Sequence, residues 1–409
     1  MKNNNREFVY LNCLKYSGTV YHTQILDWLH LFDRHNVTFK LIQLFQIKEL
    51  IEPNRIKSQL SGIRESTKLF AGYLFLFPSR NFFALLNAII IYSKLRRVFL
   101  RNSEVLIFSR ALIGPEIRYL RKITKCKLIF IFDARAATAE EKKYSAIKQN
   151  EYNPRKANRI AGILNLENRT LSEADKVFSV SDILTSYFVK TMSCPASKFF
   201  KYPCLSDSDK FFFDTSLRER TRNDLGLNDK TLVFIYSGGI KASWHMAGSM
   251  FKFFNEMQKC NQNVKILLLT KDTSVVEKYL LQYPDLRSRI ISLYVNNNEV
   301  FKYLNAADFG ILFRENTIMN NVASPTKFAE YMLCGLPVII SEGVGDYSSY
   351  VIEKGVGFLL NESELKFPEE FKFENLSDKK LSRDYIAQLG KQHFSKQSII
   401  YEIVKQFIA

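Results

Sequence analysis

The sequence predicts an α/β protein built from two similar halves. Apolar runs typical of buried strands alternate with helical patterns from one end of the 409-residue chain to the other. Such alternation favours parallel sheets whose strands are joined by crossover helices. Between the halves lies a polar, proline-containing stretch, Lys201–Asp209, which is the best candidate hinge.

Ten short apolar runs are expected to form the strands. They are residues 8–11, 38–43, 105–108, 127–132 and 176–180 in the first half, and 232–236, 265–269, 290–294, 309–312 and 338–340 in the second. We therefore predict one domain at residues 1–205 and another at 206–385, followed by a helical segment at 386–409. With 46% hydrophobic residues, the chain can form a substantial core in each domain.

The positive charge is concentrated in the first half. The chain carries a net charge of +17, and residues 1–205 hold 33 Lys and Arg against 16 Asp and Glu. Residues 206–409 hold 25 of each kind. A half with this excess indicates an anionic partner, which could be a membrane surface, a polyphosphate, an anionic polymer or nucleic acid.

The cysteines and the N-terminus indicate a reducing compartment. The six cysteines form no CxxC pair and no regular spacing, so buried thiols are expected rather than a zinc site or a disulfide framework. The N-terminal MKNNNREFVY lacks the apolar core of a signal peptide. We therefore expect a cytoplasmic location.

The most apolar region of the chain is residues 70–100, which Pro78, Arg80 and Lys94 interrupt, so no transmembrane helix is expected there. Within it, the apolar block Phe82–Tyr92 is followed by Lys94, Arg96 and Arg97. An apolar block with a basic margin suits a helix lying at a membrane interface. The alternative is a buried helix of the first domain, and the pattern leaves both open.

The segment Ser324–Ser341 predicts a short anion-binding helix that leads into a buried strand. Ser324 suits the N-cap, Pro325 the first helical position and Gly335 the residue just past the C-terminus. The free N–H groups at the start of such a helix favour a phosphate, and Lys327 adds a full positive charge. Glu330 follows one turn later on the same side. The alternative is an ordinary capped helix with Lys327 and Glu330 as a solvated pair.

This segment, SPTKFAEYMLCGLPVI, resembles the donor site of GT-B glycosyltransferases, in particular the retaining family 4-like group of bacterial polysaccharide and cell-wall enzymes. The resemblance implies two Rossmann-like domains facing a central cleft, with a C-terminal helix that returns to the first domain. It also implies that Ser324, Pro325 and Thr326 bind the donor and that Glu330 binds the ribose hydroxyls. The group's pattern is Glu-x7-Glu, and this chain has Val322 in place of the first Glu.

A second donor-side element follows the predicted strand 232–236. Gly238 and Gly239 stand at the carboxyl edge of that strand, where ligands bind in open α/β sheets, and glycine lets a backbone approach a phosphate closely. Similar enzymes often carry Gly-Arg here with a Lys nearby. This chain has no Arg at the turn, so Lys241 and Lys327 are expected to stabilise the leaving diphosphate. His245 comes shortly afterwards and could touch the donor.

Three elements of the first half resemble the acceptor side of the same enzymes. Asp133 and Arg135 follow a predicted strand and match an Asp-x-Arg-Gly segment except that Ala136 replaces Gly. Arg110 follows the preceding strand, and Gly18 follows the first. At the carboxyl edge of a parallel sheet, Asp133 and Arg135 could contact an acceptor. The alternative is that they cap a helix and pair with neighbours.

The resemblance thus implies a nucleotide-sugar-dependent glycosyltransferase, retaining and without a metal, acting on a lipid-linked or polymeric glycan. We assign catalytic roles to Lys241, Lys327, Asp133 and Arg135, and acceptor contacts to Gly18 and Arg110. A UDP- or GDP-sugar is expected as co-substrate, with no further cofactor and no nucleic-acid partner. Because the first half is basic, the protein should lie at the inner face of the cell membrane. The rivals are a non-catalytic basic module that binds nucleic acid or anionic membrane, and a GT-B sugar-nucleotide epimerase.

Overall fold

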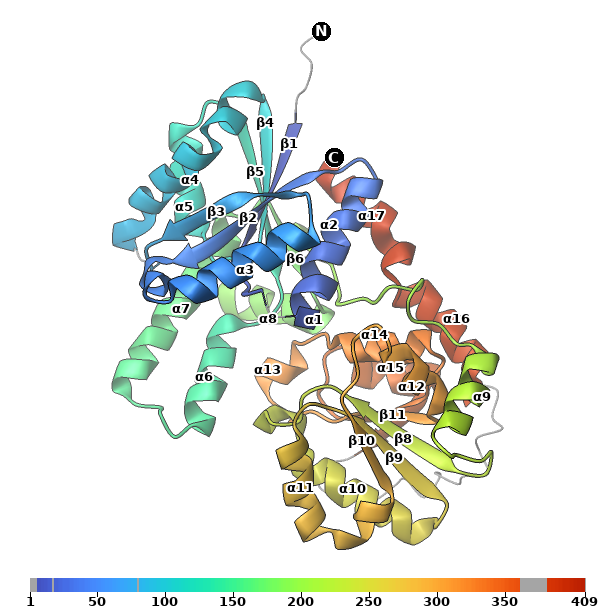
Figure 1. Cartoon of the computed structure of the whole chain (residues 1–409). Coiled ribbons are helices and arrows are strands. Elements are labelled where there is room, and N and C mark those ends of the chain that lie inside the picture. Colours follow the sequence, from blue (N-terminus) through green and yellow to red (C-terminus); the bar gives the residue numbers. More distant parts are fainter. Residues whose placement is uncertain (1–5, 17, 79–80, 361–380, 409) are drawn as a thin grey trace. The chain divides into compact units, whose positions relative to one another are not determined.

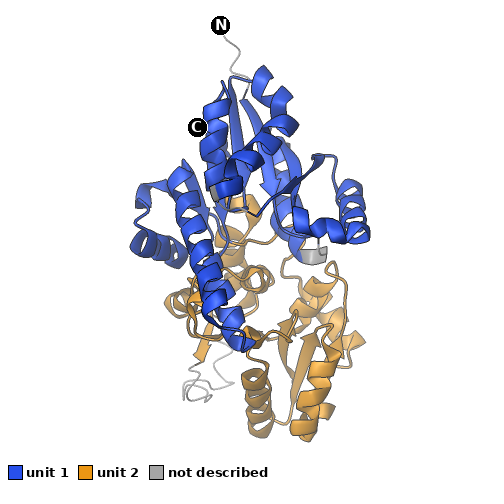
Figure 2. Ribbon diagram, turned by 90° about the vertical axis from the view of Figure 1, so that its left-hand side faces the viewer, with its two compact units in different colours: residues 1–203, 400–409 blue, residues 204–399 orange. Residues whose placement is uncertain are grey.

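The computed structural model describes residues 6–16, 18–78, 81–360 and 381–408, and the chain divides into two compact α/β units (Figures 1 and 2). The first unit comprises residues 1–203 together with 400–409, and the second comprises residues 204–399. The division thus falls two residues before the boundary predicted from the sequence. Of the predicted final segment, residues 400–409 join the first unit, whereas the helix at 383–393 belongs to the second.

The first unit is built on a parallel sheet to which the described residues contribute seven strands, in the order β3-β2-β1-β4-β5-β6-β7. The strands are β1 (Arg6–Asn12), β2 (Phe39–Gln46), β3 (Phe70–Leu76), β4 (Glu104–Ser109), β5 (Lys127–Ala134), β6 (Lys176–Ser179) and β7 (Phe199–Lys201). The chain order reverses direction across the sheet at β1, which pairs with both β2 and β4. Such a switch point is where open α/β sheets bind their ligands, beyond the carboxyl ends of the strands.

Helices connect these strands. They are α1 (Gly18–Tyr21), α2 (Asp27–Arg34), α3 (Pro53–Ser66), α4 (Asn81–Arg101), α5 (Gly114–Ile123), α6 (Thr138–Lys148), α7 (Pro154–Glu173) and α8 (Asp182–Met192). The end of α17 (Lys396–Ile408) completes the core, because the Phe407 ring lies 5.0 to 5.4 Å from the rings of Phe32, Phe39, Phe108 and Phe178.

The second unit contains a parallel sheet with six described strands in the order β10-β9-β8-β11-β12-β13. The strands are β8 (Leu232–Ser237), β9 (Val264–Leu269), β10 (Ile290–Leu293), β11 (Phe309–Leu312), β12 (Val338–Ser341) and β13 (Gly357–Leu360). The helices are α9 (Thr215–Asp224), α10 (Ala247–Cys260), α11 (Thr273–Gln282), α12 (Val300–Ala306), α13 (Ile318–Asn321), α14 (Thr326–Leu333), α15 (Tyr347–Lys354) and α16 (Arg383–His393). Both units are therefore Rossmann-like, as predicted.

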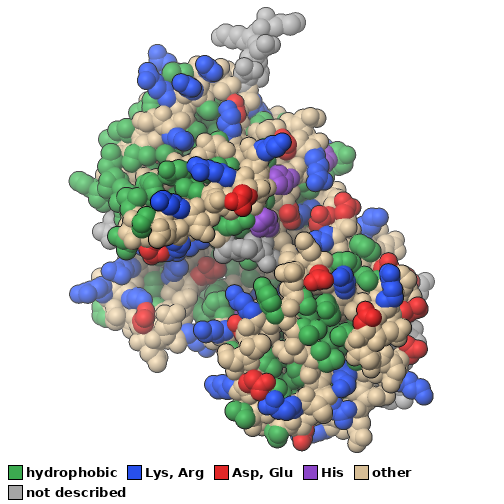
Figure 3. Space-filling model, viewed as in Figure 1, with side chains coloured by type: hydrophobic (Ala, Val, Ile, Leu, Met, Phe, Trp, Pro, Cys, Tyr) green, Lys and Arg blue, Asp and Glu red, His purple; other side chains and the backbone are tan. Residues whose placement is uncertain are grey.

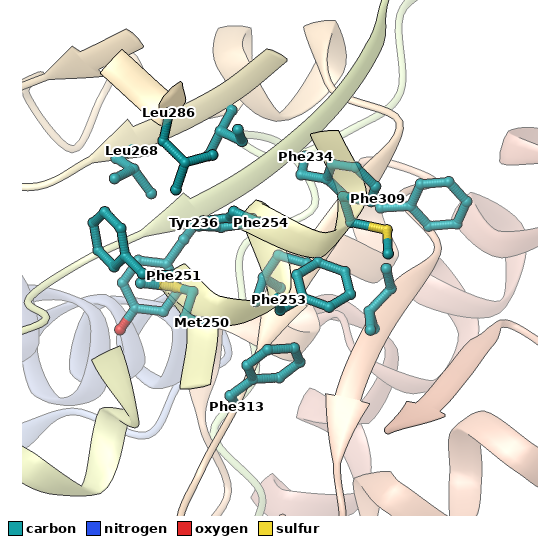
Figure 4. Packing of buried hydrophobic residues seen from close by; sticks show 14 of the residues in the cluster. Phe234, Tyr236, Met250, Phe251, Phe253, Phe254, Leu268, Leu286, Phe309 and Phe313 are labelled. Atoms are coloured by element: carbon teal, nitrogen blue, oxygen red, sulfur yellow. The ribbon is translucent and has the colours of Figure 1, made fainter. Parts of the chain in front are cut away.

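An aromatic core holds α10 against the second sheet (Figure 4). Phe253 of α10 meets Phe234 of β8 edge to face at 5.6 Å between ring centroids, and meets Phe313 at 5.5 Å. All three side chains are buried. Since β8 and β11 are adjacent, this packing fixes the positions at which the loops after these two strands begin.

All ten predicted strands overlap observed ones, and three strands were missed. β3, β7 and β13 lie at or next to sheet edges, where one side of the strand lacks a neighbour. β7 and β13 are three and four residues long, and β3 mixes exposed and buried positions, so none shows the continuous apolar run of a central strand. The expectation of buried thiols is correct for Cys194, Cys204 and Cys334, whereas Cys13 and Cys260 are exposed.

Helix α4 has one buried face and one exposed apolar face. Ala84, Ala88, Ile91, Leu95 and Phe99 are buried, as expected from the alternative of a helix that packs within the first domain. Phe82, Leu85, Leu86 and Ile89 form an exposed stripe at helical spacing, with 87%, 45%, 41% and 46% of their surfaces accessible. Figure 3 shows hydrophobic side chains gathered over α4. Across the described residues, no helix is both long and apolar enough to span a bilayer.

Candidate functional site

The centre of the candidate site is helix α14, which begins at Thr326 after Pro325 and is followed by Gly335 in the left-handed conformation, with φ of +64°. The predicted Ser324 N-cap is wrong. Its hydroxyl accepts a hydrogen bond from the Cys204 N–H at 2.9 Å and lies 2.6 Å from the Tyr347 hydroxyl, so it is used to hold the segment before the helix. The N-cap residue is Pro325, whose side chain makes no capping hydrogen bond to α14.

Lys327 and the loop after β8 come together, as predicted. The Lys327 amine lies 5.4 Å from the centroid of the Tyr236 ring on β8. A Cβ atom on Gly238 would stand only 2.7 Å from Lys327 Nζ and Cε, and Gly238 has a φ of +126°, which side chains rarely adopt. The glycine is therefore needed both for its backbone conformation and to leave room for the lysine amine.

A second cation, Arg314, was not predicted from the sequence. It follows β11 directly, its N–H donates to Ser341 Oγ at 2.8 Å, and its side chain is partly buried. Its charge helps to lower the pKa of Lys327. The argument that identified Gly238, a residue just beyond the carboxyl end of a central strand, applies equally to Arg314 and would have found it.

His245 is a neutral neighbour of these two cations. Its Nδ1 lies 3.2 Å from the Tyr236 hydroxyl, which donates to the Gly239 carbonyl at 2.8 Å. Burial, with the charges of Arg314 and Lys327, lowers the pKa of His245 to about 2. The imidazole therefore remains neutral at physiological pH and adds no charge to the site.

The electrostatics of the site favour an anion. Burial lowers the pKa of Lys327, which means that the surrounding protein holds the charged amine at a cost. Within the described residues, neither Lys327 nor Arg314 forms an ion pair with a carboxylate. Glu330, one turn further along α14, is buried, and desolvation raises its pKa, so a solvated Lys327–Glu330 pair is not what the structure contains. A bound anion would supply the missing negative charge.

Asp272 fixes the loop that follows β8. Its Oδ2 accepts hydrogen bonds from the N–H groups of Ile240 at 2.8 Å and Lys241 at 3.1 Å. These two N–H groups are therefore already used within the protein. Lys241 itself is exposed, and no contact among the described residues brings its amine to Lys327. Its role on a diphosphate stays a prediction.

The position of the missing first Glu is filled by an apolar side chain. Val322 is buried at the end of α13. The neighbouring Gly345 has a φ of +51°, and a Cβ on it would lie 2.0 Å from the Ala323 carbonyl oxygen. Val322 is thus buried and Ala323 lies close against Gly345 in the segment that leads into α14. This packing fixes where the helix begins.

The first unit brings Arg110, Asp133 and Arg135 together at the carboxyl ends of β4 and β5. The buried Asp133 carboxylate accepts hydrogen bonds from Arg110 Nε at 3.1 Å, Arg135 Nε at 2.5 Å and the Tyr10 hydroxyl at 3.1 Å. The Arg135 guanidinium also lies 4.2 Å from the centroid of the Tyr202 ring. Asp133 therefore orients two guanidinium groups, and the three residues together carry one excess positive charge.

Two predictions remain to be compared with the structure: the position of Gly18 and the independence of the reaction from a metal. Gly18 is the first residue of α1, just beyond the carboxyl end of β1. Among the residues that the structure describes, no group of three His, Cys, Asp or Glu side chains is arranged to hold a metal ion. Metal independence remains a prediction about the reaction.

Comparison with known proteins identifies the fold. No protein-family model matches the sequence, and no curated protein matches it. Among solved structures, HepE of Anabaena, determined with UDP and glucose, is 14% identical with a TM-score of 0.64, over 98% of this chain and 99% of its own. A glycosyltransferase of Rickettsia africae is 13% identical with a TM-score of 0.65, over 98% and 99%. The lipopolysaccharide outer core galactosyltransferase WaaB is 11% identical with a TM-score of 0.62, over 98% of each chain.

The chain has the GT-B fold. The identities are too low for the likeness to say more than this, because one fold supports many activities. The site described above lies at the carboxyl ends of β8 and β11 in the second Rossmann-like unit of the GT-B chain. Its chemistry, rather than the fold, must therefore carry the functional argument.

Proposed function

We propose that the chain is a glycosyltransferase that moves a sugar from a nucleotide-sugar donor, a UDP- or GDP-sugar, to a hydroxyl of a lipid-linked or polymeric glycan. The reaction would retain the configuration of the sugar, need no metal or further cofactor, and serve bacterial surface polysaccharide synthesis. The observation that carries this proposal is the cationic cluster of Lys327 and Arg314 beside Gly238, with no carboxylate ion-paired to either within the described residues. The HepE complexes with UDP and with UDP-glucose support it.

The cluster suits the leaving group of this reaction. When the bond between the anomeric carbon and the diphosphate oxygen breaks, negative charge develops on the diphosphate. Cations already held in a site shielded from water stabilise that charge without having to reorganise. The free N–H groups at the start of α14 add to the effect, since the helix dipole points its positive end at the same place.

Glu330 and the first unit would supply the remaining contacts. Glu330 would accept hydrogen bonds from the ribose hydroxyls, because a carboxylate is a strong acceptor for paired hydroxyl groups. Gly239 and Thr326 flank the diphosphate in this proposal. On the acceptor side, Asp133 would hold Arg110 and Arg135 in place to bind an anionic or hydroxyl-rich acceptor.

A panel of UDP-, GDP-, ADP- and CMP-sugars tests the proposal by thermal shift. At a concentration of about 100 times the dissociation constant, the correct donor should raise the free energy of unfolding by roughly 2.7 kcal/mol. We expect a UDP- or GDP-sugar to give this effect and the Lys327→Met variant to lose most of it. If no sugar nucleotide stabilises the protein and nucleic acid binds in a salt-sensitive manner, the non-catalytic rival is correct.

We also propose that α4 places the enzyme at the inner face of the cell membrane. Leu100, Arg96 and Arg97 extend the exposed stripe of α4 towards its C-terminus, so one face is apolar at one end and basic at the other. Lys94, by contrast, points its amine over Gly72 of β3. Each basic residue close to an anionic bilayer contributes about 1 kcal/mol of attraction.

Vesicle co-sedimentation tests this docking. Binding of the protein should rise with the content of anionic lipid and fall with salt, because salt shortens the screening length. Arg96→Glu with Arg97→Glu should abolish most of it. The matched control is Lys57→Glu with Lys68→Glu, which makes the same charge change at exposed positions outside α4. Equal binding to neutral and anionic vesicles, or equal loss in both double variants, would contradict docking through α4.

A further inference from the structure

The first unit contains a large cavity that the donor site does not use. Its volume is about 1260 Å³, and its walls come from the segments after β1, β2, β3 and β4 and from α6 and α7. It therefore lies beyond the carboxyl ends of these strands, around the switch point of the sheet, which is where an open α/β sheet binds its ligand. Ligand pockets usually occupy about 300 to 1,000 Å³, so this cavity has room for a large ligand.

The charged residues of the cavity are almost all cationic. They are Lys15, Lys48, Lys142, Arg155, Arg159 and Arg169, with Glu49 as the one acidic lining residue. Glu49 is engaged by Arg55 at 2.7 Å, so it does not neutralise the cavity. In the part of the chain that the structure describes, none of the six cations forms an ion pair with a carboxylate. An unbalanced set of this size attracts a multiply charged anion.

The rest of the lining is apolar. It includes Leu44 and Phe45 at the end of β2, Leu76 and Phe77 at the end of β3, and Leu166 on α7. A free inorganic anion would gain nothing from such a wall, since apolar surface lowers the affinity for strongly hydrated groups. The combination fits a ligand with an anionic head and a hydrocarbon part.

The apolar wall is continuous with the exposed stripe of α4. The Phe77 ring stacks on the Phe83 ring at 4.9 Å with an angle of 12° between the planes, and Phe83 meets Phe82 at 5.1 Å. Asn87 of α4 accepts from the Phe77 N–H at 2.9 Å and donates to the Phe77 carbonyl at 3.1 Å. Aromatic side chains thus lead from the cavity to the surface that we propose to meet the membrane.

Gly162 is an exposed residue of the cavity lining. It stands in the middle of α7 and lines the cavity, and a Cβ atom placed on it would have no atom within 4 Å. Glycine inside a helix costs about 1 kcal/mol relative to alanine. No crowding of neighbouring atoms requires glycine here, so the space in front of it is the feature that a larger side chain would remove.

We propose that this cavity binds the lipid phosphate of the acceptor and that the acceptor is a lipid carrying a phosphate or diphosphate next to its glycan. Arg110 and Arg135, which do not line the cavity, would then contact the glycan. The anionic head would lie among the six cations, and the hydrocarbon chain would leave past Phe77 along the apolar stripe of α4. The role as acceptor rests on the proposed function, whereas binding of the lipid phosphate does not. The inference narrows the acceptor to lipid-linked glycans and excludes neutral polymers.

Binding of farnesyl diphosphate, a short lipid diphosphate, tests this inference when measured by titration calorimetry on the full chain. We expect farnesyl diphosphate to bind, and farnesol and inorganic pyrophosphate to bind at least about tenfold more weakly, since each lacks one half of the ligand. Gly162→Leu should weaken binding about tenfold or more because the leucine side chain would take space in the cavity that the ligand needs. Gly162→Ala is the matched control: it strengthens the helix, fills little of the space and should bind almost normally.

Two further variants separate this site from the donor site. Arg155→Gln with Arg159→Gln removes two exposed charges and should weaken farnesyl diphosphate at least about tenfold while leaving the donor nucleotide unaffected. Lys327→Met should weaken binding of the donor nucleotide and leave binding of farnesyl diphosphate unaffected. If Lys327→Met weakens binding of farnesyl diphosphate while the Gly162 and Arg155/Arg159 variants bind it normally, the ligand occupies the donor site and the inference is wrong. If the cavity variants weaken binding of farnesyl diphosphate while no sugar nucleotide binds the protein, the inference about the cavity is supported and the proposed transferase activity is contradicted.

Discussion

Replacing Lys327 by Met should lower the rate of sugar transfer about 100-fold, the usual effect of removing one preorganised electrostatic group. The amine is held against Gly238 and the Tyr236 ring, so it occupies one position before any ligand arrives. Met has a similar length and shape without the charge, and the variant should therefore fold normally. Steady-state kinetics should show the loss chiefly in kcat, because the leaving diphosphate carries more charge in the transition state than in the bound donor.

Two neighbouring lysines show whether the effect belongs to this position. Lys271 follows β9 at the same edge of the sheet and is exposed, so Lys271→Met is the matched control and should leave the rate unchanged. Lys241→Met tests the other lysine assigned to the leaving group. If it also lowers the rate about 100-fold, the loop must bring Lys241 to the diphosphate when the donor binds. Normal turnover of both Lys241→Met and Lys327→Met would contradict the leaving-group model.

The pH dependence of nucleotide binding gives an independent readout. Burial and the charge of Arg314 lower the pKa of Lys327. The amine attracts the diphosphate only while it is protonated, so this part of the affinity is present below the lowered pKa and is lost as the pH rises through it. Lys327→Arg should keep its charge at alkaline pH and shift this loss upward, because guanidinium remains protonated there. An unchanged alkaline limb in Lys327→Arg would mean that another group causes it.

The parts of the site that the sequence predicted are those fixed by local chemistry. Gly335 ends α14 because it takes a left-handed conformation. The start of the helix was predicted one residue too early, because Pro325 is the N-cap residue and not the first helical one. Asp133 and Arg135 follow a central strand and were predicted for the same reason. Each of these inferences needs only the residue and its immediate neighbours in the chain.

The parts that the sequence did not predict depend on contacts between distant segments. Ser324 looks like an N-cap, yet its hydroxyl binds Cys204, 120 residues away, and Tyr347, 23 residues away. Asp272 accepts a hydrogen bond from the Ile240 N–H in the loop after β8. The two segments meet only because β9, which precedes Asp272, is paired with β8. Neither partner can be read from a local pattern, since strand order decides which loops meet.

The cavity of the first unit shows the same limit. The sequence placed the positive charge in the first half, but charge composition does not say which residues share one hollow. Arg155 and Arg159 reach the cavity because α7 runs along it, and Lys48 reaches it from the segment after β2. The sequence therefore predicted an anionic partner and left its binding site unknown.

Replacing Glu330 by Gln should weaken binding of the donor nucleotide by about 1.5 to 3 kcal/mol, the usual scale for hydrogen bonds to a charged group. Gln has the same size and keeps one acceptor, so the change removes the charge and leaves the packing of α14 intact. Burial raises the pKa of Glu330, which means that the surrounding protein disfavours the charged carboxylate. The variant should therefore be at least as stable to heat as the natural protein, and a loss of binding could not be blamed on unfolding.

The ribose supplies the decisive comparison for Glu330. If Glu330 binds the ribose hydroxyls, a 2′,3′-dideoxy form of the donor nucleotide should bind the natural protein as weakly as the ordinary nucleotide binds the Glu330→Gln variant. Combining both changes should cost little more than either alone, because they remove the same hydrogen bonds. Inorganic pyrophosphate, which has no ribose, should bind both proteins equally. Additive losses in the combined experiment would show that Glu330 and the ribose act independently, and the carboxylate would then need another partner.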